Sequence, residues 1–122
     1  VKKIDSLVPS NKENVFVKID VEGSEYRVLK GMESLLQNTN IEVLVELHTW
    51  GDTTIQKYPH HVLSYLKGFG FMCYKTHAHY LFTKTSKNLE HINISSEIIR
   101  HYIKHILWKI PALRWIKYKI FG

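Results

Sequence analysis

The periodicity of the apolar residues between positions 15 and 47 constrains the fold more than any other feature of this chain. Residues 15–19 (VFVKI) are a short run of β-branched and aromatic side chains, which is typical of a strand covered on both faces. After a turn at residues 20–24 the period becomes helical, and residues 41–47 (IEVLVEL) then predict a second strand. The apolar side chains of the intervening helix are Val28, Leu29, Met32, Leu35 and Leu36.

The rest of the chain continues this alternation. Pro59 suits the first turn of a second helix, which Gly68-Phe69-Gly70 ends. Residues 71–75 and 80–84 predict two strands, and the gap between them is short enough for an antiparallel hairpin. The order β-α-β-α-β-β predicts an α/β fold with right-handed crossovers, a parallel sheet and an antiparallel edge hairpin. We expect Gly31, inside the first helix, to permit close packing on the sheet.

Length and charge indicate how the chain is organised. Its 122 residues, 44% of them hydrophobic, support one domain, which we expect to occupy residues 1–86. Residues 87–96 then form a linker, and residues 97–122 form a basic amphipathic helical tail. Because that tail carries six Lys or Arg and one acid, the net charge of +6 belongs mainly to it. We therefore expect no nucleic acid partner for the domain.

Two interpretations of the tail stay open. Its basic residues and tryptophans are what a helix at a membrane interface needs. Alternatively its apolar stripe, which begins at Ile98, packs on protein, and this is the interpretation that we prefer. The sequence shows no signal peptide and no bilayer-spanning stretch, and its single cysteine, Cys73, excludes an internal disulfide. We expect a cytoplasmic protein, with peripheral membrane contact through residues 97–122 as the alternative.

Polar side chains follow two neighbouring strands of the predicted sheet. Asp20 and Glu22 come after the first strand, and Glu46 and His48 end the second. Parallel neighbours bring these groups to one rim, where ligands bind in open parallel sheets. Such a cluster could hold a cation, accept a hydroxyl proton or bind a polar substrate. The alternative is that the acids cap the next helix and the others are ordinary strand-end groups.

The remaining histidines do not predict a metal site. His60 and His61 are adjacent, so their side chains diverge on a helix. His77 and His79 share one hairpin and provide too few ligands for a closed zinc site. We assign no metal ligands.

Several short motifs occur in order and resemble one known family. They are KIDVEGSEY at residues 18–26, VLKG at 28–31 and VELH at 45–48, with IDSL at 4–7 just upstream. Together they resemble the FkbM methyltransferases over roughly residues 1–84. The resemblance implies a Rossmann-like class I methyltransferase sheet, S-adenosylmethionine as the cofactor, and a hydroxyl of a sugar, lipid or polyketide as the methyl acceptor. It also implies that this chain is the carboxyl-terminal half of such a domain, since no glycine-rich cofactor loop is recognised.

The resemblance and the clustered acids together lead to a mechanistic hypothesis. Asp20 orients the acceptor hydroxyl or a cation and, with Gly23, contacts the cofactor. Glu22 supports Asp20, His48 is the general base because its ordinary pKa lies near neutrality, and Glu46 either orients His48 or holds the loop in place. The alternatives are a truncated, non-catalytic remnant and a partner or membrane-surface binding module. A homo-oligomer or a separate amino-terminal half is the expected protein partner.

Overall fold

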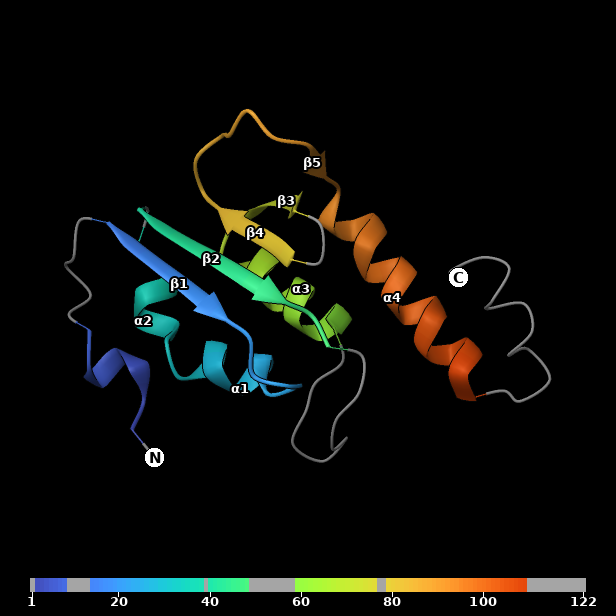
Figure 1. The fold of residues 1–122 in the computed structure, drawn as a ribbon, viewed down its shortest axis with the longest axis horizontal. Helices are drawn as coiled ribbons and strands as arrows, with labels where there is room; N and C mark the ends of the chain where they lie inside the picture. Colours follow the sequence, from blue (N-terminus) through green and yellow to red (C-terminus); the bar gives the residue numbers. More distant parts are fainter. Residues whose placement is uncertain (1, 9–13, 39, 49–58, 77–78, 110–122) are drawn as a thin grey trace.

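A computed structural model describes residues 2–8, 14–38, 40–48, 59–76 and 79–109. Five strands form one sheet in the order β1-β2-β4-β3-β5 (Figure 1). In chain order they are β1 (Val15–Ile19), β2 (Ile41–Glu46), β3 (Met72–Thr76), β4 (His79–Thr83) and β5 (His91–Ile92). The helices are η1 (Ile4–Ser6), a 3-10 turn, then α1 (Glu25–Lys30), α2 (Glu33–Leu36), α3 (Pro59–Gly68) and α4 (Ile94–Lys109).

The sheet is mixed. β1 and β2 pair in parallel, with Ile19 opposite Val45. The predicted β3–β4 hairpin is confirmed, and it pairs through β4, which runs antiparallel to β2. β4 therefore lies between β2 and β3, and β1–β2 is the one parallel pair among the described strands. The short strand β5 lies within the segment expected to be a linker and pairs antiparallel with β3.

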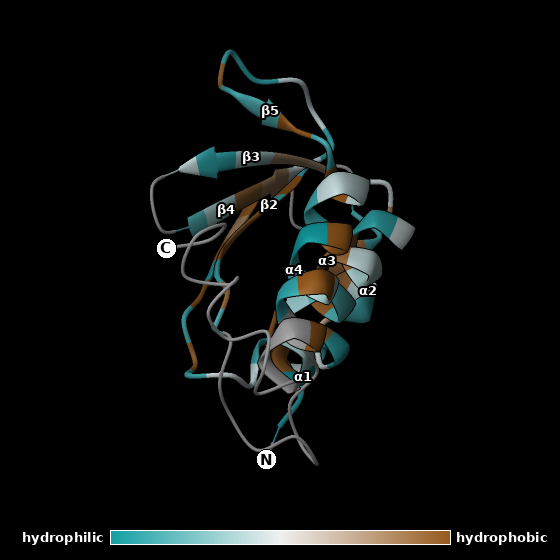
Figure 2. Ribbon diagram, turned by 90° about the vertical axis from the view of Figure 1, so that its right-hand side faces the viewer, coloured by the Kyte–Doolittle hydropathy of each residue, from teal (hydrophilic) through white to brown (hydrophobic). Residues whose placement is uncertain are grey.

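All four α-helices lie on one face of the sheet (Figure 2). Along β2 the side chains alternate between buried and half-buried, with Ile41, Val43 and Val45 buried. On β1 the same alternation leaves Phe16 62% exposed. The expectation that β1 is covered on both faces is therefore wrong for the described residues. Its inward residues belong to the common hydrophobic core, while Phe16 and Lys18 are exposed.

The helix expected after Ser24 is divided at Gly31 and Met32 into α1 and α2. The element η1 contacts the chain at this division. The Asp5 carboxylate accepts hydrogen bonds from the backbone N–H groups of Ser34 (3.0 Å) and Leu35 (3.1 Å), while the Asp5 N–H donates to the Gly31 carbonyl (3.1 Å). Asp5 thus caps α2, and the close approach at Gly31 is to η1 rather than to the sheet.

α4 begins at Ile94, inside the segment expected to be a linker, and its continuation into the predicted tail packs on the folded body. α4 packs along α3, and Ile94 joins the core that the sheet forms with the helices, with Ile98 against it. The part of the tail from residue 110 onward lies outside the described residues, as does His77. Within the part of the chain that the structure describes, no helix is both long and apolar enough to cross a bilayer.

Candidate functional site

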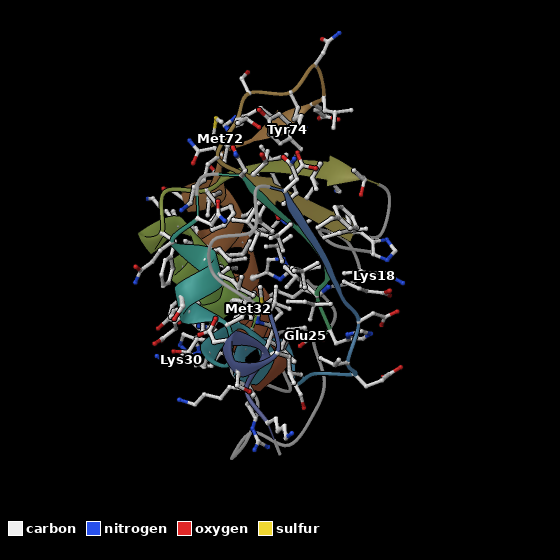
Figure 3. All side chains as sticks on the ribbon, turned by 90° about the vertical axis from the view of Figure 1, so that its left-hand side faces the viewer. Lys18, Glu25, Lys30, Met32, Met72 and Tyr74 are labelled. Atoms are coloured by element: carbon white, nitrogen blue, oxygen red, sulfur yellow. The ribbon has the colours of Figure 1, made fainter. Side chains whose placement is uncertain are left out.

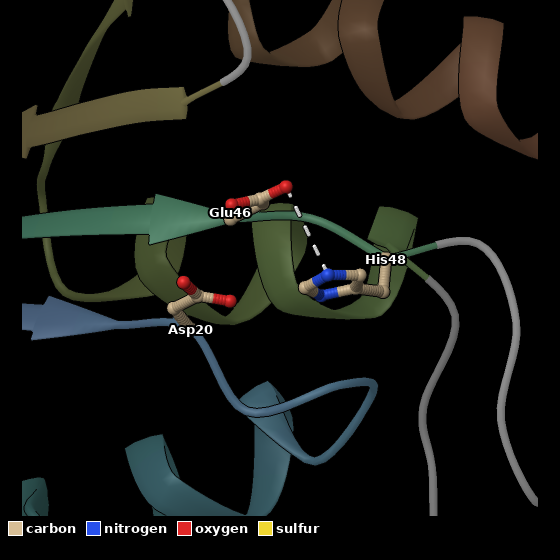
Figure 4. Close-up of side chains that lie close together, drawn as sticks. All are labelled: Asp20, Glu46 and His48. Atoms are coloured by element: carbon tan, nitrogen blue, oxygen red, sulfur yellow. Dashed lines mark ion pairs between the residues drawn. The ribbon is translucent and has the colours of Figure 1, made fainter.

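The parallel pairing of β1 and β2 positions the candidate site. Because Ile19 lies opposite Val45, the residues that follow these two strands come out at the same end of the sheet. Figure 4 shows the result: Asp20 at the end of β1 points toward Glu46 and His48 at the end of β2. The rim consists of Asp20, Glu22, Glu46 and His48, together with Glu25 at the start of α1, described next.

A buried pair between α1 and the end of β2 anchors this rim. The Glu25 side chain is 2% exposed and that of His48 is 6% exposed, and Oε1 lies 2.6 Å from Nδ1. A carboxylate can only accept, so Nδ1 carries the proton and donates it. In Figure 3 Glu25 lies inside the body of the protein, whereas Lys18 and Lys30 lie at its periphery.

The turn between β1 and α1 makes this pair possible. Glu22 and Gly23 both adopt positive φ, at 48° and 93°. Glycine adopts such angles readily, whereas a glutamate there is uncommon. The turn brings the Gly23 N–H within 2.9 Å of Oε1 of Glu25, to which it donates. The Glu25 carboxylate is therefore held both by the turn that precedes it and by His48.

Three side chains converge at the rim, and His48 of the buried pair is one of them. One oxygen or nitrogen atom from each of Asp20, Glu46 and His48 lies within 4.8 Å of the others. Nε2 of His48 is 3.9 Å from Oε1 of Glu46, and the other oxygen of Glu46 is 3.3 Å from Nε2 of His79. Asp20 also contacts Lys18 at 3.4 Å. This spacing suits a bound divalent cation or a hydroxyl that shares its proton with Nε2.

The charges of the rim act on the imidazole. Burial by itself lowers the pKa of His48, but the hydrogen bond to Glu25 and the negative charges of Glu25 and Glu22 outweigh burial. The net effect is a pKa above the ordinary 6.5. The rim therefore favours a positive charge on this ring, which is the form that results when a base has accepted a proton.

The structure brings together three of the residues proposed from the sequence, namely Asp20, Glu46 and His48. Glu22 is exposed in the turn and acts on His48 through its charge. The residue that sequence reasoning missed is Glu25, which we expected only to favour the first turn of a helix. The structure gives Glu25, rather than Glu46, the contact with Nδ1. The sequence feature that could have identified Glu25 was its position in the EGSE motif, directly after the turn.

Comparisons with known proteins identify the family of this sequence. The Methyltransferase FkbM domain family matches residues 1–73, which include β1, β2 and the whole rim. A hexuronic acid methyltransferase, AglP of Haloferax volcanii, is 53% identical over 51 residues, which are 39% of this chain and 20% of that protein. The matched part thus spans a fifth of that relative's length. No solved structure matches the chain significantly. Because the family match covers more than half of the residues, the chain belongs to the FkbM methyltransferase family.

Proposed function

We propose that this chain supplies the acceptor-binding rim of an S-adenosylmethionine-dependent O-methyltransferase. The observation that carries the proposal is the buried Glu25–His48 pair, which fixes one ring nitrogen as a donor and holds the other on the side of Glu46. A hydroxyl must lose a proton as it takes up a methyl group, and a positioned imidazole is the commonest group for that task. Glu25 acts through His48, so it is a positioning residue.

The acidic side chains of the rim suit the positively charged and hydroxyl groups of the cofactor. S-adenosylmethionine is positively charged at sulfur and carries an amine and ribose hydroxyls, all of which favour acidic neighbours. The Asp20 side chain is 39% exposed at the end of β1 and is available for such a contact. Gly23 keeps the adjoining turn compact, and its own N–H is already engaged by Glu25. Asp20 and the Gly23 turn are thus the proposed cofactor contacts.

The proposed reaction assigns each rim residue a task. When bound, S-adenosylmethionine supplies a methyl group activated by the adjacent sulfonium. Asp20 would orient the acceptor hydroxyl, and Nε2 of His48 would take its proton while the methyl carbon passes from the sulfonium sulfur to the oxygen, which leaves S-adenosylhomocysteine as a neutral thioether. Glu25 keeps the proton of His48 on Nδ1 and stabilises the imidazolium that forms. Glu46 lies 3.9 Å from Nε2, where it favours the same charge.

The acceptor is proposed from the comparison and the chemistry of the rim. Since AglP is a hexuronic acid methyltransferase, a sugar hydroxyl is the first class to test. Asp20, Glu22 and Glu46 make the rim acidic, and an acidic rim disfavours a carboxylate close to the reacting oxygen. We therefore propose a sugar hydroxyl as the methyl acceptor. Neutral sugars and hexuronic acids should be compared as acceptors in the same methyl-transfer assay. A lipid or polyketide hydroxyl is the next class.

Calorimetric titration with S-adenosylmethionine and S-adenosylhomocysteine is the direct test of the cofactor. Binding by the 122-residue chain, weakened in Asp20→Asn, would support the proposed contacts. A folded chain that binds neither compound would show that residues 1–122 are not sufficient for the cofactor site. Titration of Glu90→Gln is the matched control and should equal wild type, because Glu90 is exposed just before β5, at the opposite edge of the sheet from β1.

The role of His48 is tested by methyl transfer in a preparation that contains this chain and is active. His48→Gln should lower kcat by about 100-fold or more, the usual contribution of a general base. His91→Gln, an exposed histidine on β5, should leave kcat unchanged. Because the pKa of His48 is raised above 6.5, the acidic limb of the kcat/KM profile should lie above that value and move to lower pH in Glu25→Gln. Unaltered methyl transfer in His48→Gln would refute the assignment.

A further inference from the structure

The two faces of α4 differ in what covers them. On the inner face Ile94 and His101 are buried and Ile98 packs against the core, next to α3. On another face Ile99, Tyr102, Ile103 and Ile106 are 59%, 52%, 44% and 39% exposed. These four residues follow the spacing i, i+3, i+4, i+7, so they line up as one stripe along the helix, called the α4 stripe below.

α4 lies at the side of the described fold. In Figure 1 it stands away from β1, and in Figure 2 it belongs to the layer of helices. Tyr102 makes an edge contact with the ring of His60, at 5.3 Å between centroids, yet half of it stays exposed. Isolated exposed apolar residues are ordinary, but an aligned stripe of large ones marks an interaction surface.

The charge of the surrounding sequence identifies the kind of partner. No Asp or Glu occurs after Glu97, whereas six Lys or Arg do. Glu97 itself is neutralised by Arg100, whose guanidinium lies 2.7 Å from its carboxylate. The same stretch contains Trp108, Trp115 and Tyr118, which are residue types that favour the boundary between lipid and water. An apolar helical stripe within a purely basic sequence is complementary to a bilayer with anionic headgroups.

We propose that the α4 stripe and the basic sequence that follows it bind the surface of an anionic membrane, with α4 lying in the plane of the interface. Ile99, Ile103 and Ile106 enter the boundary region of the lipid, and Tyr102 lies at headgroup level. Lys104 and the positive charge of the sequence that follows α4 attract the anionic headgroups. The proposed contact is peripheral, because it uses one face of α4. The proposal is independent of methyl transfer.

Vesicle flotation of the whole chain tests the proposal. Vesicles of phosphatidylcholine and phosphatidylglycerol at about three to one should carry the protein, while pure phosphatidylcholine should carry at least about tenfold less, because several basic residues each contribute attraction. Sodium chloride at about 0.5 M should weaken binding to the anionic vesicles, since it screens those charges. Equal flotation with both lipids would overturn the proposal.

The variant that isolates the stripe is Ile99→Ser with Ile103→Ser, which keeps the charge unchanged. Removing two apolar anchors should lower the partition coefficient by about tenfold or more. The matched control is Leu89→Ser, because Leu89 is 50% exposed in a loop before β5 and should not matter. Circular dichroism and thermal unfolding should show that both variants stay folded. Unchanged flotation of the double variant would refute the stripe's role, and a wild-type dimer that ignores vesicles would show that a second copy covers it.

Discussion

Glu25→Ala is the change that most directly probes the buried pair. Oε1 of Glu25 accepts two hydrogen bonds, from the Gly23 N–H at 2.9 Å and from Nδ1 of His48 at 2.6 Å. Hydrogen bonds to a charged group contribute about 1.5–3 kcal/mol each, and removing one partner of a buried ion pair costs about 3–5 kcal/mol. We expect Glu25→Ala to lower the free energy of unfolding by about 3–5 kcal/mol. That is a large part of the stability of a small domain.

The measurement is urea unfolding followed by far-ultraviolet circular dichroism. Glu25→Gln keeps the shape and one acceptor but loses the charge, so a smaller loss of about 1–2 kcal/mol is expected. Glu90→Ala is the matched control, because Glu90 is exposed in the loop before β5 and its replacement should change stability by less than about 0.5 kcal/mol. If Glu25→Ala behaves like Glu90→Ala, the buried pair does not contribute to folding.

The pH dependence provides a second criterion. The pKa of His48 is raised in the folded state, so the folded chain binds this proton more tightly than the unfolded chain does. That contribution is fully present below the ordinary pKa of 6.5 and is lost as the pH rises through the folded-state pKa. The cost of Glu25→Ala should therefore be greater at about pH 6 than at about pH 9. An equal cost at both pH values would refute the ionic part of the argument.

Three further predictions follow from the same structure. We propose that His48 accepts a proton and does not bind a metal, so EDTA should leave the rate of methyl transfer unchanged. If EDTA abolished methyl transfer and Mg²⁺ restored it, Asp20, Glu46 and His48 would instead be cation ligands. Burial lowers the pKa of His101 to about 4, so acid should unfold the chain more easily as the pH falls below 6.5. Urea titrations give the free energy of unfolding at about pH 7 and at about pH 4.5. The decrease between these two pH values should be smaller in His101→Leu than in wild type by about 2–3 kcal/mol. Burial also raises the pKa of Cys73 to about 12, so a disulfide reagent should label it at about pH 8 only after urea is added.

Local sequence was enough to predict the elements whose periodicity is unbroken. β1 has the bounds expected from its apolar run, α3 begins at the expected Pro59, and β2 ends one residue before the expected Leu47. The rim followed from these elements, because parallel neighbours must bring their carboxyl ends to one side. Asp20, Glu46 and His48 therefore converge as predicted.

Contacts between distant residues explain what local sequence could not predict. The helical period from Val28 to Leu36 is continuous, yet the structure has two helices there, and Asp5 caps the second of them from 29 residues before Ser34. Similarly, the position of β4 between β2 and β3 depends on which strand of the hairpin pairs with β2, and strand periodicity does not encode that choice. The exposed face of β1 could not be predicted from local sequence either. An apolar run indicates that side chains are buried, but it does not indicate which element covers them.

Glu25 has a role in the structure that its position in the sequence motif did not predict. In isolation, an acid in the first turn of a helix is explained by the helix dipole, and Glu25 occupies that position in α1. The structure adds two constraints: its carboxylate is buried, and its partner His48 is 23 residues later in the chain. A buried carboxylate requires such partners, and the turn at Glu22 and Gly23 supplies one of them through the Gly23 N–H. The glycine is therefore needed for its positive φ, the first acid of the motif lies at the rim, and the last acid holds the imidazole. These separate roles explain the spacing of the acids and the glycine in DVEGSE. They also explain why the second strand is followed by the histidine of VELH, which pairs with the last acid of DVEGSE.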